Sequence, residues 1–128
     1  MCGIAGFVDQ RSAPSDRAAA VARMCEAMLR RGPDDAGIET CGAATLGMRR
    51  LAIFDPANGH QPMVSPDRRH TLVFNGAIYN FRALRDELAS GGWLFRTNCD
   101  TEVLLAAFAR WGERCLARSD VLARLGAV

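Results

Sequence analysis

The order of short strands and helices constrains the fold of this chain more than any other feature. Strand-like and helix-like segments follow one another without a regular strand–helix–strand repeat, which argues against a doubly wound parallel sheet. The pattern predicts an α+β protein or a layered sandwich. Strands are expected over 3–8, 45–54, 71–74 and 93–96, with a polar loop over 55–66. Helices are expected to start at Ser15 or Asp16 and end at 30–33, to run from Tyr79 or Asn80 to 91–92, and to start at Asp100–Thr101 and reach Trp111.

The length and composition indicate one globular domain. The chain has 128 residues, of which 49% are hydrophobic and 23% charged, so one core and no global disorder are expected. Its net charge of +2 favours neither nucleic-acid nor membrane binding. All 16 basic residues are arginine, which excludes a Schiff-base lysine or a lysine phosphate loop.

The cysteines and histidines predict neither a metal centre nor a disulfide framework. The chain has five cysteines, an odd number without metal-ligand spacing, and its two histidines, His60 and His70, are expected on the surface without a role. Because we find no signal or membrane segment, we expect a cytoplasmic location. Four thiols are expected to be buried as small hydrophobic groups: those of Cys25, Cys41, Cys99 and Cys115.

Cys2 differs from the other cysteines because it follows the initiator methionine. If Met1 is removed, one residue carries both a nucleophilic sulfur and a free α-amine, which titrates near pH 8 and can act as a base. The plainer interpretation is a buried thiol at the start of a strand, and from Cys2 alone that interpretation is favoured.

Two further segments each allow a structural and a chemical role. Asn75-Gly76 is typical of a tight hairpin turn, and the alternative is a pair of amide donors for an oxyanion. Asp100 is either a helix cap or a carboxylate for a ligand ammonium group. On the residues alone, the turn is the favoured interpretation of Asn75-Gly76.

Arg50 is unusual because it lies within an apolar run. Buried arginine is normally paired, so one interpretation is an ion pair with Asp34, Asp35 or Asp55. The other is a fork that binds a ligand carboxylate through two parallel hydrogen bonds.

Six motifs occur in order along the chain, and together they are far more specific than any one of them. They are MCGIAGF at 1–7, RRGPDDAG at 30–37, RRLAIFD at 49–55, GHQP at 59–62, FNGAIYNF at 74–81 and TNCDTEVLL at 97–105. This series strongly resembles the N-terminal glutaminase domain of class II glutamine amidotransferases, and most closely that of glutamine-hydrolysing asparagine synthetases and similar amidotransferases. The resemblance covers about residues 1–116.

The resemblance implies a fold, a reaction and a set of site residues. The fold would be a four-layer αββα sandwich of the N-terminal-nucleophile hydrolase type. Cys2 would attack the side-chain amide of glutamine to form a thioester, with ammonia and then glutamate released. By similarity, Asn75 and Gly76 form the oxyanion hole, Arg50 rather than Arg49 holds the substrate α-carboxylate, and Asp100 binds its α-ammonium. RRGPDD and GHQP would be mainly architectural loops.

The same resemblance implies partners and cofactors. Glutamine would be the substrate, and a synthetase domain or chain would receive the ammonia. The glutaminase step would need no cofactor and no metal, whereas ATP and Mg would be required by the synthetase domain. No nucleic acid or membrane partner is expected, and a homodimer is left open.

Two departures from the family pattern stand out. Where the family commonly has N-G-E-I-Y-N, this chain has Ala77, so we expect weaker glutamine binding. Residues 117–128 form a divergent tail, as a frameshift or truncated gene model would produce, which would leave the sandwich incomplete. The alternative function is therefore a non-catalytic remnant that at most binds glutamine or a partner.

Overall fold

The computed structural model describes residues 1–52 and 57–127 and combines helices with small antiparallel sheets, in agreement with the predicted α+β class. The elements are β1 (Gly3–Val8), α1 (Pro14–Ala27), β2 (Asp35–Cys41), β3 (Ala44–Arg50), β4 (Met63–Val64), β5 (Thr71–Ile78), α2 (Phe81–Ser90), α3 (Asp100–Trp111), a 3-10 turn (Gly112–Arg114), α4 (Cys115–Arg118) and β6 (Val121–Ala127). Within these ranges, we find no helix with the length and apolar character needed to cross a membrane.

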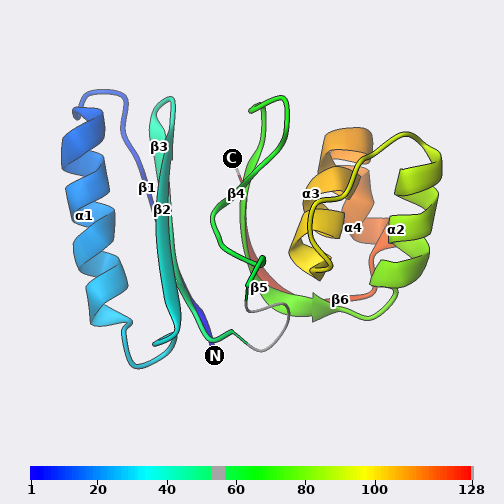
Figure 1. Ribbon diagram of the computed structural model, residues 1–128. Helices are drawn as coiled ribbons and strands as arrows, with labels where there is room; N and C mark the ends of the chain where they lie inside the picture. The colour runs from blue at the N-terminus through cyan, green and yellow to red at the C-terminus, as the bar shows by residue number, and fades with distance from the viewer. Residues whose placement is uncertain (53–56, 128) are drawn as a thin grey trace.

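The first sheet has the strand order β1-β3-β2 and is covered on one face by α1 (Figure 1). Its antiparallel register pairs Gly3 with Arg49. The helix packs directly on the strand backbone at Gly47, where a Cβ atom would lie 2.4 Å from Val21 Cγ1 and 2.7 Å from Cys25 Sγ. Only glycine therefore allows α1 to approach the centre of this sheet so closely.

The second sheet has the order β4-β5-β6, and α2, α3 and α4 lie beyond it (Figure 1). β5 and β6 are antiparallel, and their pairing runs from Leu72 opposite Ala127 to Ile78 opposite Val121. Most of residues 117–128, predicted from the sequence to be a divergent tail, therefore belong to helix α4 or strand β6. One apolar cluster joins β5 to the helices and includes Leu72, Phe74, Ile78, Leu84, Leu88, Val103, Leu104 and Leu105.

The inner faces of the two sheets meet across a smaller apolar cluster. Val73 of β5 is fully buried against Leu46 and Met48 of β3, and Cys2 and Ile4 pack against the same cluster. Because side chains two residues apart share one face of a strand, position 50 of β3 lies on the face toward β5. Positions 75 and 77 of β5 likewise lie on the face toward the first sheet.

Two predicted features of this core are wrong. Asn75-Gly76 does not form a hairpin turn, because β5 continues through both residues to Ile78 and pairs with β6 along its whole length. The segment 93–96 is not a strand, because the buried carboxylate of Glu102 accepts hydrogen bonds from the backbone N–H groups of Arg96 and Thr97, at 2.9 Å and 2.7 Å.

Other boundaries differ by smaller amounts. The strand predicted over 45–54 spans Ala44–Arg50, and residues 53–56, which include Asp55, lie outside the described part of the chain. The predicted polar loop contains the short strand β4, and β2 was not predicted. The three predicted helices are confirmed, although α1 ends at Ala27.

The thiols and histidines largely follow expectation. Cys25, Cys99 and Cys115 are buried, and Cys41 is the exception because its side chain is half-buried beside Thr71. His60 is exposed, whereas the half-buried ring of His70 packs edge-on against the Phe108 ring at 5.4 Å between centroids.

Candidate active site

The Cys2 thiol lies between the sheets and is positioned by the backbone of the residue that follows β3. Its Sγ accepts a hydrogen bond from Leu51 N at 3.3 Å and lies 3.7 Å from Leu51 O. The pairing of β1 with β3 brings the two residues together, since Gly3 is opposite Arg49. The first sheet therefore holds the sulfur at the edge of the inner cluster, where the side chain is half-buried.

Arg49 and Arg50 lie on opposite faces of β3. The Arg49 guanidinium donates to Gly32 O at 2.9 Å and lines a cavity of about 400 Å³ between α1 and β2. Arg50 alternates to the inner face and is only 6% exposed, so its charge is directed toward the second sheet. Arg50 is thus the arginine on the face toward β5, and its role in the site stays a prediction.

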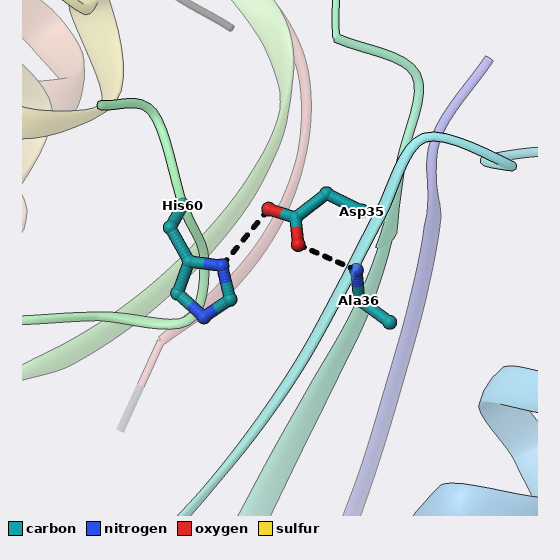
Figure 2. Close-up of polar contacts among 3 residues, drawn as sticks. All are labelled: Asp35, Ala36 and His60. Carbon is teal, nitrogen blue, oxygen red and sulfur yellow. Dashed lines mark hydrogen bonds and ion pairs between the residues drawn. The ribbon is translucent and has the colours of Figure 1, made fainter. Parts of the chain in front are cut away.

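The aspartates weighed as partners for Arg50 make bonds of their own. Asp34 Oδ2 accepts from Ala52 N at 2.8 Å. Asp35 Oδ1 accepts from Ala36 N at 2.8 Å, and its Oδ2 lies 2.9 Å from His60 Nδ1, as Figure 2 shows. Each carboxylate thus helps to join the end of the first sheet to a neighbouring segment.

Asn75 connects the two sheets at Cys2. Its Nδ2 group donates to the backbone carbonyl of Cys2 at 3.3 Å. Because an amide nitrogen carries two hydrogens, one can make this bond while the second can serve another acceptor. The contact places the first of the two predicted oxyanion donors at the residue that carries the thiol.

The backbone N–H of Gly76 points to the same edge of β5 as two donors that bond to side chains. Phe74 N donates to Gln61 Oε1 at 2.6 Å, and Ile78 N donates to Asp100 Oδ2 at 3.2 Å. Successive N–H groups of a strand point to opposite edges, so Gly76 N–H lies between these two on one edge. The glycine is also exposed, which leaves room for a ligand at this point.

Asp100 is the first residue of α3, and its carboxylate turns toward β5 to meet Ile78 N. Burial raises the pKa of the Asp100 carboxyl above its ordinary value. The backbone N–H groups of Ile78 and Thr101, and the Arg50 guanidinium, act in the opposite direction. A carboxylate and a guanidinium of opposite charge therefore face the same inner region.

The contacts of Gln61 could not be predicted from the sequence, although this residue lies in the GHQP motif. The Gln61 side chain is 5% exposed and bonds to both Phe74 N and the Thr101 hydroxyl.

Ala77, where the family commonly has glutamate, lies two residues after Asn75 on the same face of β5 and is half-buried. Within the described residues, no group of three His, Cys, Asp or Glu side chains is arranged to hold a metal ion.

Comparison with known proteins confirms the resemblance seen in the motifs. Residues 1–122 match the family described as glutamine amidotransferase domain. The chain is 36% identical to the glutamine-hydrolysing asparagine synthetase 1 of Bacillus subtilis, over 92% of this chain and 19% of that protein. It is 40% identical to a putative asparagine synthetase of Mycobacterium tuberculosis, over 92% of this chain and 20% of the relative. Asparagine synthetase 3 of Arabidopsis thaliana is 38% identical over 94% and 20%.

The chain therefore spans about a fifth of the length of the curated relatives that it matches. The family match, in contrast, extends over nearly all of its 128 residues. On this match, the chain belongs to the glutamine amidotransferase domain family.

Proposed function

We propose that this chain is a glutaminase domain that hydrolyses glutamine to glutamate and ammonia, with Cys2 as the nucleophile. The observation that carries the proposal is the bond from Asn75 Nδ2 to the Cys2 carbonyl at 3.3 Å, because it joins the strand that bears the thiol to the strand that bears the amide donors. We also propose that the order of helices and sheets in Figure 1 is the four-layer αββα sandwich of N-terminal-nucleophile hydrolases.

The charges at the site suit a free amino acid. Arg50 binds the α-carboxylate of glutamine through its planar fork, and Asp100 binds the α-ammonium group. The bond from Ile78 N to Asp100 Oδ2 orients this carboxylate against β5. The substrate amide then extends toward Cys2.

The reaction proceeds in two steps. The Cys2 sulfur attacks the side-chain amide carbon while the Cys2 α-amine, free once Met1 is removed, takes the thiol proton. Asn75 Nδ2 and Gly76 N–H stabilise the oxyanion of the tetrahedral intermediate. The carbon–nitrogen bond breaks, the amine returns the proton to the leaving nitrogen, and ammonia departs. Water then hydrolyses the γ-glutamyl thioester, which releases glutamate and restores the thiol.

The ammonia acceptor is a synthetase domain or a separate synthetase chain. The names of the relatives support this assignment, since they are glutamine-hydrolysing asparagine synthetases about five times as long as this chain. ATP and Mg belong to that partner, and the hydrolysis of glutamine needs neither. We place the protein in the cytoplasm.

Glutamate release from glutamine by the full chain tests the proposal. We expect turnover by the parent chain, an intact mass that lacks Met1, and no turnover by Cys2→Ala. Cys41→Ala is the matched control, because Cys41 is a half-buried thiol at the opposite end of the first sheet and should leave turnover unchanged. Glutamine binding without glutamate release would instead favour a non-catalytic binding module.

A further inference from the structure

We infer that Gln61 is a positioning residue of the glutaminase site: its side chain fixes the start of α3, with Asp100, against the part of β5 that carries Asn75 and Gly76. This inference rests on the proposed function. It adds a residue outside the substrate-contacting set, because Gln61 acts through its neighbours and not on the substrate.

The orientation of the Gln61 amide follows from its partners. Phe74 N–H is only a donor, so the atom that faces it at 2.6 Å is Oε1. Nε2 then donates to Thr101 Oγ1 at 3.2 Å. The amide is buried, so loss of either bond leaves a polar group without water to replace its partner.

The two partners are the immediate neighbours of site residues. Phe74 precedes Asn75 along β5, and Thr101 follows Asp100 in the first turn of α3. One side chain therefore sets the span between the amide donors and the carboxylate that receives the substrate ammonium. Without it, the bond from Ile78 N to Asp100 Oδ2 is the remaining described polar tie between β5 and Asp100.

The segment that carries Gln61 also contacts the first sheet. His60 Nδ1 lies 2.9 Å from Asp35 Oδ2 on β2, as the dashed line in Figure 2 marks. At Gly37, a Cβ atom would lie 2.1 Å from the Gln61 carbonyl oxygen, so strand and segment are in direct backbone contact. Gln61 thus joins the sheet that bears Cys2 to both β5 and α3.

A positioning role predicts a selective defect. If the start of α3 shifts, the ammonium of the substrate loses its partner, whereas Cys2 and Arg50 stay on the first sheet. Errors of about 1 Å at such contacts are enough to cost large factors in rate or affinity. A ligand without the α-ammonium group should therefore not sense the change.

The test measures binding to the full chain with Cys2→Ala, so that no turnover occurs. Isothermal titration compares glutamine with glutaramate, which is glutamine without its α-amino group. We expect Thr101→Val to raise the Kd for glutamine about tenfold, as the loss of one buried hydrogen bond implies, and to leave the Kd for glutaramate within about twofold. Thr101→Ser keeps the hydroxyl and should restore the parent Kd.

Gln61→Met is the second variant, since it removes both bonds while keeping an unbranched side chain. It should shift the ratio of the two Kd values in the same direction, and thermal melting verifies that each variant is folded. Equal losses for both ligands, or no loss for glutamine, would overturn the inference. The proposed function fails separately, if the chain with Cys2 intact releases no glutamate from glutamine.

Discussion

Replacing Ala77 with glutamate tests how the site holds the amino end of its substrate. Ala77 lies two residues beyond Asn75 on the inner face of β5, a separation of about 7 Å along the strand. Its neighbour Ile78 donates to Asp100 Oδ2, so a carboxylate at position 77 would lie beside the acid proposed to bind the α-ammonium. We expect Ala77→Glu to lower the KM for glutamine.

The size of the effect follows from the surroundings of Ala77. A hydrogen bond to a charged group contributes about 1.5–3 kcal/mol, which corresponds to roughly ten- to a hundredfold in affinity. The position is only half-buried, and a second carboxylate repels Asp100, whose pKa burial already raises. Both effects reduce the expected gain in affinity for glutamine to about tenfold, the lower end of this range.

Steady-state glutamate release at pH 8 measures the change. Because the ammonium contact is the same in the ground state and the transition state, KM should fall with little change in kcat. Ala77→Gln is the matched control, and its uncharged amide should lower KM only about threefold. An unchanged or higher KM in a folded Ala77→Glu protein, or an equal effect of the two variants, would refute the reasoning.

Further expectations concern Arg50, Gly37 and Asp100. Arg50→Lys removes the guanidinium fork proposed to hold the substrate carboxylate and should raise the KM for glutamine at least about tenfold. Arg49→Lys, on the opposite face of β3, should change this KM less than about twofold. Equal KM values for the two variants would contradict the assignment of Arg50 to the substrate carboxylate. Gly37→Ala places a Cβ atom 2.1 Å from the Gln61 carbonyl oxygen and should lower the free energy of unfolding in urea by about 1–3 kcal/mol. Burial raises the pKa of Asp100, so glutamine binding should weaken with falling pH already above the ordinary aspartate value of about 3.9, and Asp100→Asn should abolish this acid limb. The same raised pKa favours the protonated folded state, so its contribution to stability is present below about pH 3.9 and is lost as pH rises through the folded-state value.

Periodicity predicted the elements whose apolar faces are continuous. The strand at 3–8 and all three helices have such faces, and they lie near their expected positions. β2 has no such pattern, because it is an edge strand with one neighbour and mostly half-buried side chains. Its existence depends on pairing with β3, which no local pattern encodes.

Local preference was overruled where another segment supplied or took the hydrogen bonds. The Asn75-Gly76 dipeptide favours a turn, but pairing with β6 keeps both residues extended. The mostly apolar segment 93–96 favours a strand, but Glu102 takes the N–H groups of Arg96 and Thr97. In the first case the deciding partner is distant in the sequence, and in the second it lies five to six residues further along the chain.

The residues of the candidate site could likewise be predicted only in part from local sequence. Cys2, Arg50, Asn75 and Asp100 are far apart in the sequence, and only the ordered motifs linked them before the structure brought them together. The bonds of Gln61 escaped notice because its partners are a backbone N–H and a hydroxyl, which leave no motif of their own.

The short strand β4 covers only the first residues of β5, so the rest of that edge of β5 is not paired with a strand of the described chain. A foreign strand that docks on an exposed sheet edge needs a row of main-chain donors. Here the Phe74 and Ile78 donors already bond to the side chains of Gln61 and Asp100, and only Gly76 lies between them. A small molecule can use that single donor, whereas an intruding peptide would have to displace the buried side chain of Gln61 and the half-buried side chain of Asp100 to extend the sheet. The same contacts that shape the site therefore guard this edge against aggregation.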